Sequence, residues 1–171
     1  MDEQDAGIGS GMNELKLIYS LFDQEVRHTL GFLASLDERD WQAISHPWDS
    51  ILFHRLANNV TVEEIIKHIV MFEHYVISCV KSKEHGAVLS IEGDETLCES
   101  VPSEKDIVTC YREIHKENLG TIVSFRQSDL DKKFTFIDQP YTGIGLLWML
   151  TGHHAFHLGQ LRSMTLPVIN G

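Results

Sequence analysis

At 171 residues, of which 43% are hydrophobic, the chain is long enough to bury one hydrophobic core but too short for two domains of typical size. Its formal net charge of −11 argues against nucleic acid or an anionic membrane as a partner, because both are bound through basic patches. The three cysteines, Cys79, Cys98 and Cys110, are widely spaced, which is typical of a reducing cytoplasm and disfavours both a disulfide framework and a cysteine zinc site.

The chain begins with an acidic, glycine-rich stretch, MDEQDAGIGSG, whereas a signal peptide has a basic segment followed by an apolar one. No apolar run reaches the roughly 18 residues that a membrane-spanning helix needs. We therefore predict a disordered leader over residues 1–11, a single folded domain over residues 12–171 and a cytoplasmic location without a membrane partner.

Two segments in the first half of the chain carry apolar residues three and four positions apart, the spacing of an amphipathic helix. The first spans residues 15–33. The second begins at Thr61, whose hydroxyl is placed to cap the helix while the Glu64 side chain reaches back, the pattern of a capping box. Its apolar stripe is then formed by Ile65, Ile69, Phe72, Val76 and Cys79.

Two further helices are predicted in the second half of the chain. The third begins after Pro102, with Ser103 as its N-cap, and continues to Phe125. The fourth follows the turn PYTGIG and runs over residues 144–164, before Pro167 stops it. Almost nothing in the sequence alternates with the two-residue period of a strand.

Four helices, each with one apolar stripe, must bury those stripes against one another. The predicted fold is therefore all-α, a four-helix bundle. The connection between the first and second helices, residues 36–59, is long enough to cross the bundle or to cover a site, so we expect a crossover connection there.

The segment HHAFHLGQL, residues 153–161, places three histidines in an apolar helix. His153 and His157 are one turn apart and lie within about 20° of the middle of the apolar stripe, so they project together into the bundle. His154 lies about 80° away, at the flank of the stripe. In the second helix, His68 borders the apolar stripe at about 60–70° from its centre, where it can reach across to the pair.

The remaining histidines are less well placed for a shared site. Five lie in loops or at polar or flanking positions without a matching partner: His28, His46, His54, His85 and His115. An isolated histidine on an apolar face is commonly a hydrogen-bonded core residue, but an interior pair needs partners for all of its ring nitrogens. Spacing alone leaves metal binding and hydrogen bonding equally open for His153 and His157; neutral imidazoles on opposed helices suit zinc, nickel or ferrous iron.

The segment HHAFHLGQL resembles the pattern H-x-x-x-H-x-G-Q near the end of DinB/YfiT-like proteins, a superfamily of metal-binding four-helix bundles. VEEIIKHIVMFE resembles the second helix of that family, with His68 followed five residues later by Glu73. The similarity covers roughly residues 12–165. The resemblance implies that His68, His153 and His157 bind one divalent metal ion, zinc or nickel in the first place and iron or manganese as alternatives, with other positions left to water or substrate.

The sequence departs from the family at three places near the ligands. The family often has an acidic residue after the first histidine of the last helix, a histidine just before the last ligand and an arginine after it. Here these places hold His154, Phe156 and Leu158. The departures leave the ligands intact but put in doubt the transfer of any particular substrate, and exposed Phe156 and Leu158 would equally suit a dimer interface.

Three residues near the ligands are candidates for a catalytic or supporting role. Gln160 is placed to hydrogen-bond the second ring nitrogen of a ligand or a bound water, or to be an ordinary polar residue between helices. Glu73 and His154 are candidates for a general acid or base, although Glu73 also fits a solvated or inter-helix charge. Gly159 costs about 1 kcal/mol in a helix interior, so we expect a neighbouring helix to approach closely there.

Three functions remain open. Three neutral histidines leave a coordination position free, which is typical of a catalytic site, and known members of the family include thiol transferases and thiol-dependent isomerases. The first hypothesis is therefore an enzyme that transfers a low-molecular-weight thiol to an electrophile, with residues 36–59 lining the pocket for the electrophile. The alternatives are a metal-dependent hydrolase and a non-enzymatic metal-binding or interaction bundle, with a homodimer as one form of it.

Cys79 and Cys110 are expected to be buried and inert; Cys98 is the cysteine to test for reactivity.

Overall fold

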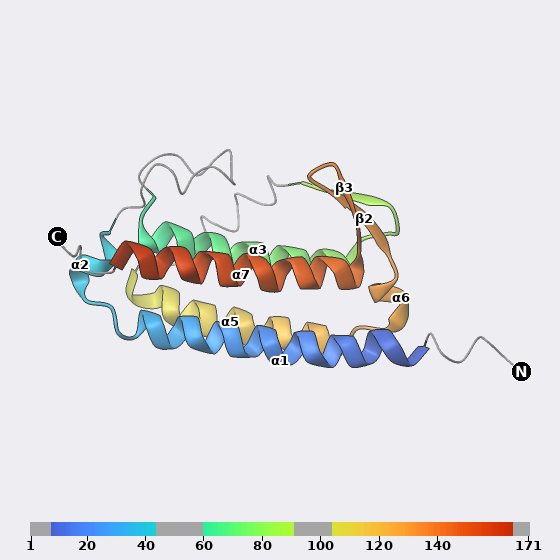
Figure 1. Ribbon diagram of the computed structural model, residues 1–171, viewed down its shortest axis with the longest axis horizontal. Helices are drawn as coiled ribbons and strands as arrows, with labels where there is room; N and C mark the ends of the chain where they lie inside the picture. Colours follow the sequence, from blue (N-terminus) through green and yellow to red (C-terminus); the bar gives the residue numbers. More distant parts are fainter. Residues whose placement is uncertain (1–7, 44–59, 91–103, 166–171) are drawn as a thin grey trace, which may run out of the picture.

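The computed structural model describes residues 8–43, 60–90 and 104–165. Four long helices form a bundle, as predicted (Figure 1). They are α1 (Ile8–Leu33), α3 (Val62–Ser82), α5 (Glu104–Val123) and α7 (Gly143–Thr165). Helix α1 includes residues 8–11, which we assigned to the leader, and so begins before residue 15, where the apolar spacing begins. None of the helices in the described ranges is both long and apolar enough to cross a membrane.

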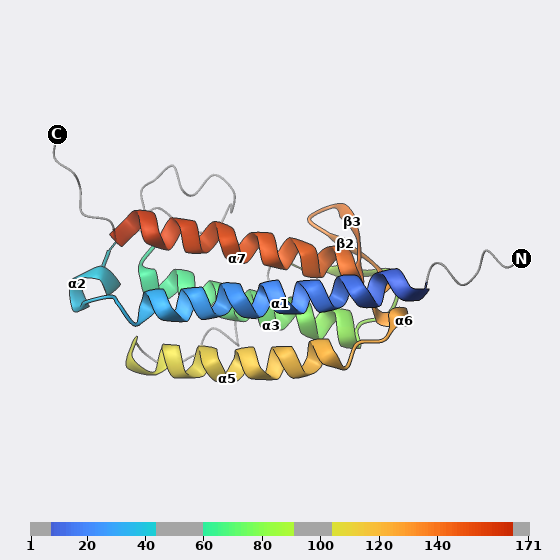
Figure 2. The same ribbon diagram turned by 60° about the horizontal axis from the view of Figure 1, so that its bottom comes forward.

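The directions of the helices do not confirm the predicted crossover between the first and second helices. Helix α1 ends where α3 begins, at the same end of the bundle (Figures 1 and 2). Helices α3 and α5 both start at the end of the bundle where α1 ends, and both run toward the opposite end. They contact each other, so they are parallel neighbours. Helix α7 packs against both α1 and α3. Residues 44–59, which belong to the predicted crossover and to the predicted pocket lining, lie outside the described residues.

The predicted capping box at the start of α3 is confirmed. The Thr61 hydroxyl accepts a hydrogen bond from the Glu64 amide at 3.3 Å, and the Glu64 carboxylate accepts one from the Thr61 amide at 2.7 Å. Both donors lack partners within the helix, so the two side chains fix where α3 begins. Ser103, the predicted N-cap of the third helix, lies outside the described residues.

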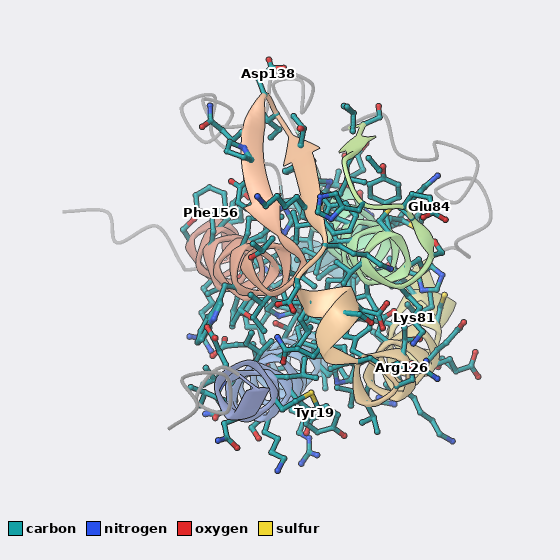
Figure 3. All side chains as sticks on the ribbon, turned by 90° about the vertical axis from the view of Figure 1, so that its right-hand side faces the viewer. Tyr19, Lys81, Glu84, Arg126, Asp138 and Phe156 are labelled. Carbon is teal, nitrogen blue, oxygen red and sulfur yellow. The ribbon has the colours of Figure 1, made fainter. Side chains whose placement is uncertain are left out.

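A small three-stranded sheet at one end of the bundle was not predicted. Its strands are β1 (Ala87–Leu89), β2 (Lys133–Phe136) and β3 (Gln139–Thr142), and β2 pairs in parallel with β1 and antiparallel with β3. The chain turns at Ile137 and Asp138, both with positive φ, so the predicted PYTGIG turn is wrong and Pro140 belongs to a strand. Strands of three or four residues are too short to show a period in the sequence. The hairpin projects beyond α3 and α7, with Asp138 at its tip (Figure 3).

Two short helices complete the described chain, α2 (Glu38–Trp41) and α6 (Gln127–Leu130). Helix α3 is the most deeply packed long helix, because Ile66, Val70 and Ile77, which lie outside the predicted stripe, are also buried. It lies between α5 and α7 and contacts both. His68 is therefore carried by a helix whose position is fixed on more than one side.

Candidate metal centre

Three imidazole rings from two helices meet inside the bundle. His68 comes from α3, and His153 and His157 come from successive turns of α7. The Nε2 atom of His153 is 3.0 Å from Nε2 of His68 and 3.1 Å from Nε2 of His157. All three ligand atoms lie within 4.8 Å of one another. The structure thus brings together the three histidines that the helical spacing and the family resemblance singled out.

The spacing of these nitrogens fits a metal ion. Nitrogen ligands at about 2.0–2.1 Å from zinc, with angles between octahedral and tetrahedral values, stand about 2.9–3.4 Å apart. Both separations at His153 fall within this span. A proton on His153 Nε2 can point toward His68 or toward His157 but not toward both, whereas a cation between the three rings can interact with the lone pairs of all three. The three histidines could therefore hold one metal ion.

Burial keeps these imidazoles neutral. His157 is fully buried, His153 is 9% exposed and His68 is half-buried. Desolvation, together with repulsion from the neighbouring rings, lowers the pKa of His68 to about 4 and that of His153 to about 2. Desolvation also lowers the pKa of His157 to about 4, against the opposing effect of its hydrogen bond to Gln160. A neutral ring has the lone pair that a metal ligand needs.

Gln160 orients one of the ligands. The Nδ1–H group of His157 donates to Oε1 of Gln160 at 2.9 Å, within the same helix. This bond places the proton on Nδ1 and leaves Nε2 as the lone-pair atom that faces His153. The side chain of Gln160 is 9% exposed, so water competes little for the bond. Of the two roles expected for Gln160, the geometry favours support of a ligand.

Replacing Gln160 by leucine is expected to weaken divalent-metal binding about 10–100-fold, because His157 loses the acceptor that fixes its tautomer. Competition with a chromogenic chelator would measure the affinity. Gln160→Glu, which keeps an acceptor for Nδ1–H, should bind the metal more tightly than Gln160→Leu. Equal weakening in both variants would show that the acceptor is not what Gln160 contributes.

Aromatic side chains surround the three histidines. The ring of Phe72 lies 4.2 Å from that of His153, centroid to centroid, and Phe136 of β2 lies 5.8 Å from Phe72. Phe156, which is 39% exposed, packs edge-on against His157 at 5.1 Å and lies on the outer side of α7 (Figure 3). Leu158 is buried, so the expectation that it is exposed is wrong. The surroundings of the ligand set are thus apolar, with Phe156 reaching the surface.

Glu73 and His154 both lie in the interior of the bundle. Both are fully buried, so the interpretation of Glu73 as a solvated charge is wrong, and its interpretation as an inter-helix charge is confirmed by its contact with His154 of α7. Nδ1–H of His154 donates to Oε1 of Glu73, and the Thr29 hydroxyl lies 2.8 Å from Nε2 of His154. The Tyr111 hydroxyl donates to the same Glu73 oxygen at 3.2 Å. Thr29 and Tyr111 were missed because nothing in the local sequence marks them as polar partners.

The fully buried Tyr111 hydroxyl remains a donor across the ordinary pH range. Desolvation, then the neighbouring Glu73 carboxylate and the hydrogen bond to it, raise the pKa of Tyr111 well above its usual range. Cys79 is buried, as expected, whereas Cys110 is half-buried, so the expectation that it is buried is wrong. Burial nevertheless raises the pKa of both thiols, which disfavours the reactive thiolate. Cys98 lies outside the described residues.

Other histidines lie apart from this cluster. His115 is buried and pairs with Asp23 of α1 at 3.0 Å, so the expectation that it lacks a matching partner is wrong. His28 and His85 are exposed, and His46 and His54 lie outside the described residues. The candidate site therefore consists of His68, His153 and His157, supported by Gln160.

Comparison with known proteins supports the fold. A scan against protein-family models and a search of curated proteins give no match. Among solved structures, the chain is similar to a DinB-like protein, YjoA, from Bacillus subtilis, with a TM-score of 0.60 and 16% sequence identity. The similarity covers 91% of this chain and 96% of that one. The helical bundle described above therefore has the DinB-like fold.

Proposed function

We propose that this protein is a divalent-metal-dependent enzyme that transfers a low-molecular-weight thiol to an electrophile, with His68, His153 and His157 as the metal ligands. The convergence of three neutral imidazoles, with Nε2 separations of 3.0 and 3.1 Å at His153, carries the proposal. Three protein ligands are the number typical of a catalytic site, since structural zinc sites are usually closed by four.

The reaction would form a carbon–sulfur bond between the thiol and the electrophile. The thiol proton passes to solvent, and the leaving group departs from the electrophilic carbon with its bonding electrons. A divalent metal bound to three neutral histidines supplies an open coordination position and lowers the pKa of a thiol that occupies it. Gln160 orients His157, while Phe72 and Phe156 provide apolar surface for an electrophile beside the ligands.

The hydrolase alternative is less well supported, because its two candidate acid–base residues, His154 and Glu73, are hydrogen-bonded to each other. His154 uses Nδ1 for Glu73, and its Nε2 lies 2.8 Å from the Thr29 hydroxyl. Both Glu73 and His154 have no exposed surface. A general base must come within hydrogen-bond reach of the proton it removes, and a buried, paired group does not reach a substrate. Thiol transfer does not require either residue as a base once the thiol is ionised.

A panel of thiols tests the proposal. Protein loaded with zinc or nickel is mixed with glutathione, cysteine or coenzyme A and a chromogenic aryl halide, and arylation of the thiol is followed. We expect turnover with at least one thiol, lost on chelation and restored by metal. His85→Ala, which removes an exposed histidine, should retain the activity. No metal-dependent turnover with any thiol would contradict the proposal, and ester hydrolysis that disappears in His153→Ala would favour the hydrolase instead.

A further inference from the structure

Each of the four long helices contributes one side chain to a buried polar cluster beside the candidate ligands. The cluster consists of Thr29 of α1, Glu73 of α3, Tyr111 of α5 and His154 of α7, and none of the four has exposed surface. Glu73 Oε1 accepts from both His154 and Tyr111, and the Thr29 hydroxyl lies 2.8 Å from the other ring nitrogen of His154. We call these residues the interhelical cluster.

The cluster joins the same two helices that carry the ligands. Glu73 follows His68 on α3, and His154 follows His153 directly on α7. The hydrogen bond from His154 to Glu73 therefore crosses the interface between α3 and α7, as does the 3.0 Å approach of His153 to His68. The two cross-links share one register, so a shift of α7 by one turn, about 5.4 Å, would break both.

Adjacent histidines on α7 create an ambiguity that the cluster resolves. His153 and His154 differ by about 100° around the helix, and the imidazole of either can be buried in its neutral form. Rotation of α7 by that angle would direct His154 toward His68 and turn His153 away. The Glu73 carboxylate accepts only from a ring that stands at the position of His154, and Tyr111 and Thr29 hold that ring from two more helices. The cluster thus distinguishes the two rings.

Stability alone is a weak explanation for such a cluster. A buried carboxylate–imidazole pair loses hydration when it is formed, and replacement of such pairs by apolar residues is often neutral or stabilising. Glu73 Oε2 has no hydrogen-bond partner among the described residues, which adds to the cost of burying the carboxylate. Buried polar groups are best attested as determinants of register between helices.

We infer that Glu73, together with Tyr111, Thr29 and His154, is a positioning set that fixes the rotation and register of α7 against α3, so that His153 and His157 face His68. The inference rests on the proposed metal site. None of the four residues touches substrate or metal in this role. Their contribution is to the affinity and geometry of the ligand set.

Two variants and one control test the inference with cobalt(II) as the probe, whose absorption spectrum reports the ligand geometry. Glu73→Gln keeps the size of the side chain and removes its charge. The double variant Glu73→Leu/His154→Leu replaces both partners by apolar groups. In both we expect cobalt(II) to bind at least about tenfold more weakly than in the wild type, with an altered spectrum.

The matched control is Asp23→Leu/His115→Leu. It removes another histidine–carboxylate pair, of buried His115 and half-buried Asp23, which joins α1 to α5 and includes no residue of α3 or α7. This variant should keep the cobalt(II) affinity and spectrum of the wild type. Unchanged affinity and spectrum in the double variant of Glu73 and His154 would overturn the inference, even if Glu73→Gln alone failed to fold. A wild-type protein that binds no cobalt(II) would overturn the metal site itself, and with it this inference.

Discussion

The His153→Ala variant, purified without metal-affinity chromatography, is expected to contain less than about one-tenth of the divalent metal found in the wild type. His153 is the central ligand, because its Nε2 atom is within 3.1 Å of the corresponding atoms of both other histidines. Loss of a residue that only supports a ligand costs about 10–100-fold in metal affinity, so loss of the central ligand should cost more than about 100-fold. Elemental analysis and titration with zinc would measure the effect.

Two further variants, His68→Ala and His85→Ala, serve as the positive and the negative control for this result. His68→Ala should lose the metal as His153→Ala does, because it removes the only ligand on α3. His85→Ala removes an exposed histidine and should retain the wild-type metal content. Circular dichroism would establish that each variant keeps its helices. A full complement of metal in a folded His153→Ala variant would exclude the three-histidine site.

The proximity of the three histidines could be predicted from the sequence because helical geometry determines it, whereas their role as metal ligands came from the family resemblance. Residues four apart on one helix project together, so His153 and His157 had to form a pair once α7 was recognised as a helix. The position of His68 beside the stripe of α3 indicated the interface with that pair. The capping box at Thr61 and Glu64 was equally local and was also confirmed.

The roles of Glu73 and His154 could not be predicted in the same way. Whether a carboxylate near an apolar stripe faces solvent or the interior depends on which residues the other helices bring to it. Tyr111 and Thr29 are distant in sequence from Glu73 and become its neighbours only through packing. Strand β2 was likewise missed because its pairing with β1 is a tertiary contact, and β3 was missed with it because β3 pairs with β2.

The surroundings of the glycines could not be predicted from the sequence either, because the free-energy cost of a glycine in a helix does not reveal which atoms lie near it. We expected a neighbouring helix to approach Gly159, but among the described residues a Cβ atom added there would meet no atom of a neighbouring element within 4 Å. The close approach occurs instead at Gly143, the first residue of α7. A Cβ atom there would lie 2.4 Å from the backbone oxygen of Asp129 and 3.1 Å from Cα of Leu130.

Alanine at these two glycines is therefore expected to change stability in opposite directions. Gly143→Ala should lower the free energy of unfolding by about 2–3 kcal/mol, because the obstructing atoms belong to the backbone of α6 and cannot move aside without displacing the start of α7. Gly159→Ala should raise it by about 1 kcal/mol, since alanine is the better helix former and meets open space. Urea unfolding of the metal-free protein would measure both values without a contribution from bound metal. A shift of the same sign in both variants would contradict the packing described for the start of α7, on which the alignment of His153 and His157 along that helix depends.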